Sequence, residues 1–128
     1  MGARILYVED NPQNMRLVRK MLNIGGYEML EATEGIPGVA LAIREMPDLI
    51  LMDINLPDID GLEATARIKA SPRSAHIPII ALTANAMHGD RERFLAAGCD
   101  GYLAKPVTKN ELLNTVAHFL TVSQHNKA

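Results

Sequence analysis

The sequence predicts an α/β fold in which a parallel sheet is covered by helices on both faces. Short apolar runs alternate along the chain with segments whose apolar residues recur at helical spacing. Three of the runs are continuous, as expected for strands that are buried on both faces of a parallel sheet. These central strands are expected at residues 4–9, 49–53 and 77–82.

Two further strands are expected, at residues 27–32 and 101–104. The first of these, YEMLEA, alternates apolar with polar residues, as a half-exposed strand at the edge of a sheet does. With short right-handed crossovers, the simplest winding gives the strand order 2-1-3-4-5. The sequence therefore predicts a doubly wound, flavodoxin-like sheet of five strands with five helices.

The helix boundaries carry local signals. Asn11 and Pro12 form an N-cap followed by proline at the first helical position. Thr108 and Glu111 have the spacing of a capping box. The five helices are expected at residues 12–24, 36–46, 61–70, 86–97 and 109–121.

Length and composition are those of one soluble domain. The chain has 128 residues, of which 48% are hydrophobic and 22% charged, and we place the domain at 1–122 with a frayed tail at 123–128. A formal net charge of −2 without a basic stripe argues against nucleic-acid binding. The single Cys99, the missing signal peptide and the lack of about 18 consecutive apolar residues favour a cytoplasmic protein without a membrane span.

Three carboxylates are expected to share one crevice of this fold. In the predicted order the chain reverses direction between the first and third strands, and ligands bind beside the carboxyl ends of strands at such a point. Glu9 and Asp10 end the first strand, and Asp53 ends the third. These groups would repel one another, whereas a divalent cation would remove the conflict. Oxygen ligands favour Mg²⁺ or Mn²⁺ over Zn²⁺.

Two other polar side chains are expected at the same edge of the sheet. Thr83 ends the fourth strand and Lys105 follows the fifth. Alone, Thr83 would be a helix-entry residue and Lys105 a solvated surface charge. Beside a metal, a hydroxyl and an ammonium are the groups that bind phosphoryl oxygens. Their coincidence with the three acids therefore predicts a site for metal and phosphate.

Four segments carry a recognisable pattern and together cover nearly the whole chain. They are ILYVEDN (5–11), DLILMDINLPDIDG (48–61), IIALTA (79–84) and AGCDGYLAKP (97–106). Their pattern resembles the receiver domain of bacterial response regulators. The resemblance implies that Asp53 accepts a phosphoryl group from a histidine kinase or a histidine phosphotransfer protein. It also implies that Asp10, Asp53 and the backbone carbonyl of Asn55 hold Mg²⁺, and that Glu9 acts through a metal-bound water.

The resemblance further implies a switch. Thr83 would bind the phosphoryl group and move toward it, Lys105 would pair with it, and the peptide bond to Pro106 would be cis. Tyr102 would turn inward and reshape the face made by the fourth helix, the fifth strand and the fifth helix. An edge strand would also expose an aromatic side chain without any switch.

The rate at which water removes the phosphoryl group is influenced in receivers by two positions. They lie two residues after the aspartate and two after the threonine, and here they are Asn55 and Asn85. Neutral amides could orient a water but could not act as a strong base, so no unusual speed is expected. The chain is thus expected to be a phosphoacceptor switch that catalyses only its own phosphoryl transfer and dephosphorylation.

The resemblance leaves the molecular context open. Residues 9–18 and 83–106 look most like stand-alone cell-division and polar-differentiation receivers, but receivers of hybrid histidine kinases share these runs. In the first case no output domain follows, and signalling would pass through an unknown downstream protein. The oligomeric state would be a monomer or a phosphorylation-dependent dimer.

The residues argue against two other classes of function, an aspartyl-nucleophile phosphatase and a binding scaffold. A phosphatase with an aspartyl nucleophile usually carries a second aspartate two residues later, where this chain has Asn55. A receiver fold kept only as a binding scaffold would have lost the phosphoacceptor, the acid pair or the lysine. Because this chain retains all of them, the sequence favours the phosphoacceptor.

Overall fold

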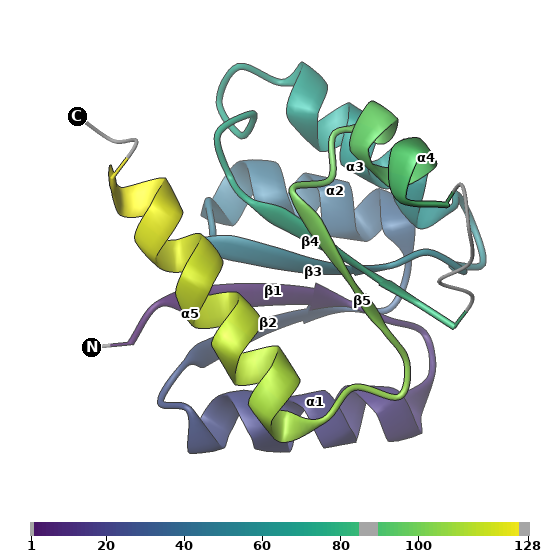
Figure 1. Ribbon diagram of the computed structural model, residues 1–128. Coiled ribbons are helices and arrows are strands. Elements are labelled where there is room, and N and C mark those ends of the chain that lie inside the picture. The colour runs from purple at the N-terminus through teal and green to yellow at the C-terminus, as the bar shows by residue number, and fades with distance from the viewer. Residues whose placement is uncertain (1, 85–89, 126–128) are drawn as a thin grey trace.

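The computed structural model describes residues 2–84 and 90–125, and it contains one parallel sheet in the order β2-β1-β3-β4-β5. The predicted strand order is therefore confirmed, and Figure 1 shows the sheet enclosed by helices. The strands are β1 (Arg4–Val8), β2 (Glu28–Ala32), β3 (Leu49–Asp53), β4 (Ile79–Thr83) and β5 (Gly101–Ala104). The helices are α1 (Pro12–Ile24), α2 (Gly35–Glu45), α3 (Gly61–Ala70), α4 (Asp90–Ala97) and α5 (Lys109–His125).

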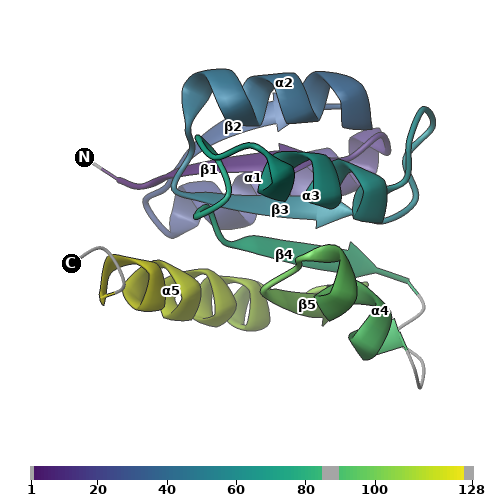
Figure 2. The same cartoon turned by 90° about the horizontal axis from the view of Figure 1, so that it is seen from above.

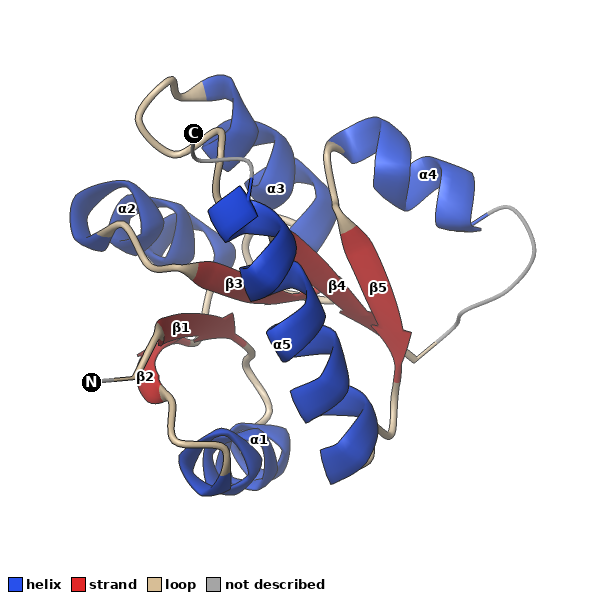
Figure 3. Cartoon of the chain, turned by 60° about the vertical axis from the view of Figure 1, so that its left-hand side comes forward, coloured by secondary structure: helices blue, strands red, loops and turns tan. Residues whose placement is uncertain are grey.

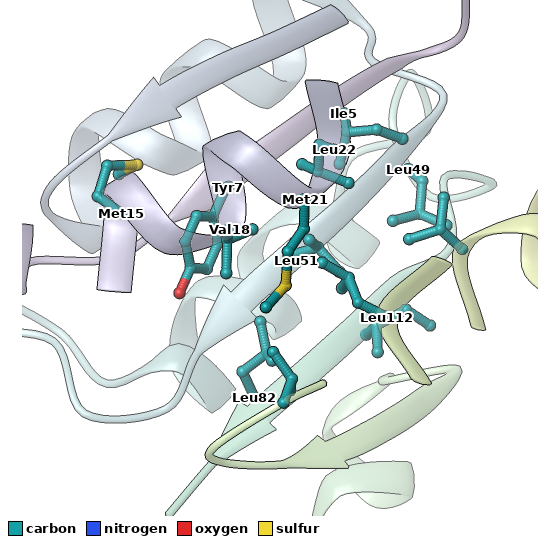
Figure 4. Packing of buried hydrophobic residues seen from close by; sticks show 13 residues of the cluster. Ile5, Tyr7, Met15, Val18, Met21, Leu22, Leu49, Leu51, Leu82 and Leu112 are labelled. Carbon is teal, nitrogen blue, oxygen red and sulfur yellow. The ribbon is translucent and has the colours of Figure 1, made fainter. Parts of the chain in front are cut away.

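The helices form a layer on each face of the sheet. Helices α1 and α5 pack on one face, whereas α2 and α3 pack on the other and α4 lies beside α3 (Figure 2). Side chains of β1 alternate between the layers, with Ile5 and Tyr7 toward α1 and Leu6 and Val8 toward α2. Figure 4 shows the buried cluster under α1. Every residue of β3 and β4 is buried, which explains their continuous apolar sequences.

The capping signals act as the sequence predicts. The Asn11 side chain accepts hydrogen bonds from the N–H groups of Gln13 and Asn14 at 2.9 and 3.0 Å, and α1 begins there. Thr108 and Glu111 form the reciprocal bonds of a capping box at 3.1 and 3.2 Å. These local bonds fix where the chain leaves the carboxyl edge of the sheet.

Some element boundaries differ from the prediction. Strand β4 begins at Ile79 rather than two residues earlier, because Pro78 has no N–H to contribute to the sheet. Helix α2 begins at Gly35 and ends one residue before Met46, which takes a left-handed conformation with φ 51°. Helix α5 continues to His125, past its predicted end and into the segment expected to fray.

Two further boundaries bear on the site and on the helix beside it. Strand β1 ends at Val8, so Glu9 lies just beyond it, with its N–H bonded to the carbonyl of Ala32 at 2.9 Å. The start of the predicted helix 86–97 falls outside the described residues, which resume with Asp90 in α4. Within the described part of the chain, no helix has the length and apolar character needed to span a membrane.

Candidate functional site

The three predicted carboxylates meet at the carboxyl edge of the sheet. Glu9 follows β1 and Asp53 is the last residue of β3, the neighbouring strand. Glu9 and Asp53 are buried, with exposed fractions of 1% and 3%, whereas Asp10 is exposed. Carboxylate oxygens of Glu9, Asp10 and Asp53 lie within 4.8 Å of one another. The cluster therefore has two buried members and one member open to solvent.

Lys105 joins the two buried carboxylates. Its Nζ donates to Glu9 Oε1 at 2.8 Å and to Asp53 Oδ1 at 2.9 Å. The backbone N–H of Lys105 donates to the carbonyl of Thr83 at 2.8 Å, which ties the residue to the end of β4. The Lys105–Pro106 peptide bond is cis, the isomer that the resemblance implies. A cation from the far end of the chain thus reaches into the acidic cluster.

The loop after Asp53 folds tightly back onto its strand. The N–H of Gly61 donates to the carbonyl of Ile54 at 2.8 Å, and a Cβ on Gly61 would lie 2.1 Å from the carbonyl oxygen of Asp53. Only glycine permits this approach. The N–H of Asn55 makes a long contact of 3.4 Å with Asp53 Oδ1. The first residues after the strand are therefore held next to the Asp53 carboxylate.

The remaining predicted residues occupy neighbouring strands. Thr83 ends β4 and is 4% exposed, and the residue before it, Leu82, pairs in register with Asp53. Tyr102 on β5 is 40% exposed, and its ring centroid lies 5.8 Å from that of Phe94 in α4. Asn85 lies outside the described residues.

Tyr7 is a site residue that the sequence reasoning missed. Its hydroxyl donates to Glu9 Oε1 at 2.8 Å, and the residue is 1% exposed. Tyr7 and Glu9 are two positions apart, so they lie on the same side of an extended chain. This spacing is a signal for the contact with Glu9. The sequence alone does not distinguish it from an aromatic residue that only packs in the core.

Burial and neighbouring charges shift the pKa values of Asp53, Glu9 and Lys105 in different directions from their ordinary values. Burial raises the pKa of Asp53 to about 6, and the hydrogen bond from Lys105 only partly offsets this effect. Burial also acts to raise the pKa of Glu9, but hydrogen bonds from Lys105 and Tyr7 outweigh it and lower that pKa. Burial acts to lower the pKa of Lys105, but Glu9 and Asp53 raise it. Glu9 and Lys105 are thus charged at neutral pH, and Asp53 titrates closest to neutrality.

The donor set fits a hard divalent cation. Three carboxylates face one ammonium, so the cluster keeps an excess of negative charge when Asp53 is ionised. The available ligand atoms are oxygens, which Mg²⁺ prefers and which suit Zn²⁺ poorly. An acidic cluster of this composition is compatible with Mg²⁺ binding.

The chain belongs to the response regulator receiver domain family, whose sequence profile matches residues 5–117. Receivers of this family are the phosphoacceptor switch domains of two-component signalling, and they interact with histidine kinases or phosphotransfer proteins.

Named relatives agree with this assignment. The polar-differentiation response regulator DivK of Brucella anthropi is 42% identical over 120 residues, which cover 94% of this chain and 98% of DivK. The receiver domain of a sensor histidine kinase from Pseudomonas aeruginosa PAO1 is 45% identical, with a TM-score of 0.89 and coverage of 94% and 99%. That crystal structure has a magnesium ion coordinated in the active site cleft. A CheY-like receiver from Methanospirillum hungatei JF-1 is 30% identical, with a TM-score of 0.88 and coverage of 98% and 99%.

Proposed function

We propose that this receiver is phosphorylated on Asp53, in a Mg²⁺-dependent reaction, by a histidine kinase or a histidine phosphotransfer protein. The observation that carries the proposal is the pair of contacts from Lys105 Nζ, at 2.9 Å to Asp53 and 2.8 Å to Glu9. An ammonium beside a buried carboxylate can bind the oxygens of a phosphoryl group that the carboxylate attacks.

The metal would be held by Asp10, Asp53 and the backbone carbonyl of Asn55, with Glu9 acting through a water. The gathering of three carboxylates within 4.8 Å supports this set, as does the magnesium ion in the similar kinase receiver. When bound, Mg²⁺ or Mn²⁺ would offset the repulsion between the carboxylates and the negative phosphoryl oxygens.

Asp53 would act as the nucleophile in its ionised form. With a pKa raised to about 6 by burial, Asp53 is mostly ionised at neutral pH. A carboxylate oxygen attacks phosphorus in line, the bond from phosphorus to the imidazole nitrogen of the donor breaks, and its electron pair stays on that nitrogen. Lys105 would pair with the transferred group, and the hydroxyl of Thr83 would donate to one of its oxygens.

The acyl phosphate would then be removed by water. Asn55 and Asn85 are the positions expected to influence this step, and their neutral amides could orient a water without acting as a strong base. The chain would therefore catalyse its own phosphorylation and its own dephosphorylation, the latter at no unusual speed, and no reaction on other substrates.

Signalling would pass through the face formed by α4, β5 and α5. Thr83 would move toward the phosphoryl group and Tyr102 would turn inward. Because the ring of Tyr102 rests 5.8 Å from Phe94, such a turn would change the contact between β5 and α4. Leu95 of α4 is 48% exposed and would add apolar area for an unknown downstream protein or for a phosphorylation-dependent dimer.

The same activity fits two molecular contexts, a stand-alone regulator and the receiver domain of a hybrid histidine kinase. The chain is 42% identical to a polar-differentiation regulator and 45% identical to the receiver of a sensor histidine kinase, so similarity supports either setting. In both settings the cytoplasm is the expected location. A phosphatase with an aspartyl nucleophile is disfavoured, because Asn55 stands where the second aspartate is wanted.

The test is to incubate the protein with a small acyl phosphate, with and without Mg²⁺, and to measure its intact mass. We expect a Mg²⁺-dependent gain of one phosphoryl group by the wild type and none by Asp53→Asn. Glu34→Gln, an exposed carboxylate outside the cluster, is the control and should be phosphorylated normally. A folded wild-type protein that gains no mass would mean that the pocket is inert and the chain a binding scaffold.

A further inference from the structure

The strand at one end of the sheet, β2, has a free backbone edge. The N–H of Glu28 and the C=O of Ala32 bond to the chain segment of β1, so they point into the sheet. Backbone direction alternates along a strand, and the N–H and C=O groups of Met29 and Glu31 therefore point outward. No strand in the described part of the chain pairs with them. Figure 3 shows β2 at this border of the sheet, between α1 and α2.

The free edge lies between two hollows, one on each face of the sheet. The hollow between α1 and β2 has a volume of about 1010 Å³, and the one between α2 and β2 about 530 Å³. Leu17, which is 46% exposed, and Met29 line the first, and Pro37 and Leu41 line the second. Because strand side chains alternate, a strand added beside β2 would direct one set of its side chains toward each hollow.

Cationic side chains surround the edge. Arg19 forms an ion pair with Glu31 of β2, with 2.6 Å between Nε and Oε2. Arg16 and Lys20 are exposed and form no ion pair within the described residues, and Arg44 borders the second hollow. The charged residues that line the first hollow are four cations and two carboxylates, namely Arg4, Arg16, Arg19, Lys20, Glu28 and Glu31. The hollow beside α1 is therefore locally positive, although the whole chain has a formal net charge of −2.

We propose that an extended, acidic segment of a partner protein docks along β2 and extends the sheet. Its backbone would pair with Met29 and Glu31, its apolar side chains would enter the hollows, and its carboxylates would meet the unpaired cations. A second copy of this chain suits the edge less well. Two-fold pairing of β2 with β2 would bring the two α1 helices together and set their cations against one another.

The test begins with random peptides displayed on phage and selected on the whole wild-type chain. The selected peptides should be acidic, and we expect Met29→Pro to weaken their binding about tenfold or more. This substitution removes an outward N–H and leaves the bonds between β2 and β1 intact. Met29→Val is the matched control, because it loses the methionine side chain but keeps the N–H, and it should bind within about twofold of wild type.

A second pair of variants tests the charge and does not depend on proline. Reversing Arg16 and Lys20 together to glutamate should also weaken binding about tenfold. Arg67→Glu, which reverses an exposed cation on α3, should leave binding unchanged. Circular dichroism verifies the fold of each variant. Asp53→Asn should bind the peptide normally, so the result is independent of phosphorylation.

The proposal is overturned if no peptide is enriched, or if the selected peptides bind equally well to Met29→Pro and to the charge-reversed protein. It is also overturned if sedimentation shows a wild-type dimer that Met29→Pro dissociates, because a second copy would then be the occupant of the edge.

Discussion

Glu9 is a buried carboxylate whose oxygens are bonded by groups from three parts of the chain. Tyr7 and Lys105 donate to Oε1 at 2.8 Å, and the N–H of Asn11 donates to Oε2 at 3.2 Å. A charge that is 1% exposed requires such partners, because an unpaired buried carboxylate is strongly unfavourable. The hydroxyl of Tyr7 is neutral, so it stabilises the charge of Glu9 without cancelling the negative potential that a cation needs.

Tyr7→Phe should therefore lower the free energy of unfolding by about 1.5–3 kcal/mol, the usual contribution of a hydrogen bond to a charged group. Urea unfolding at neutral pH measures the change. Tyr27→Phe is the control, because the described structure gives its hydroxyl no hydrogen bond. Equal effects of the two substitutions would show that the bond from Tyr7 to Glu9 contributes nothing to stability.

Among the elements, α2 begins without a cap of its own. The preceding residue, Glu34, makes no side-chain bond to the helix. The N–H groups of Gly35 and Ile36 instead donate to the two carboxylate oxygens of Asp58, each at 2.7 Å. Asp58 belongs to the loop after β3, so one carboxylate both caps α2 and anchors the loop that carries Asn55.

Asp58→Asn should lower the urea midpoint at pH 7, because it replaces one of two charged acceptors. Desolvation acts to raise the pKa of Asp58, but the hydrogen bonds from Ile36 and Gly35 outweigh it and lower that pKa. Its stabilising contribution is complete above the unfolded pKa of about 3.9 and is lost as pH falls through the lower folded value. The difference from wild type should thus shrink in acid, whereas Glu34→Gln should change little at either pH.

At the scale of the whole molecule, the buried Asp53 lowers the free energy of unfolding at neutral pH. Folding buries Asp53 at the end of a central strand, next to Glu9, and raises its pKa to about 6. An unfolded aspartate titrates near about 3.9, so folding favours the protonated form. That contribution to stability is complete below about pH 3.9 and is lost as pH rises through about 6.

Asp53→Asn should consequently raise the free energy of unfolding by about 1–3 kcal/mol at pH 7 and by much less at pH 4. The measurement is urea unfolding with a chelator present, so that no divalent cation offsets the repulsion. Glu92→Gln, which neutralises an exposed carboxylate on α4, serves as the control and should show no such dependence on pH. A loss of stability in Asp53→Asn at pH 7 would contradict this account.

Much of this molecule could be predicted from the sequence. Continuous apolar runs identified the central strands, the alternation in 27–32 identified an edge strand, and the caps at Asn11 and Thr108 located helix starts. Those signals lie within a few residues of the feature they specify. The gathering of Glu9, Asp10 and Asp53 also followed, because strand order alone brings the carboxyl ends of β1 and β3 together.

Only the tertiary structure decided how side chains meet within that frame. Lys105 bridges Glu9 and Asp53, Asp58 caps a helix that begins 23 residues before it, and the edge of β2 lies between two hollows, of which the one beside α1 is rich in cations. The periodicity of a segment reports which face is buried but not which distant side chain lies opposite. That partner is chosen by how the layers pack, and packing depends on the shapes of residues far apart in the sequence.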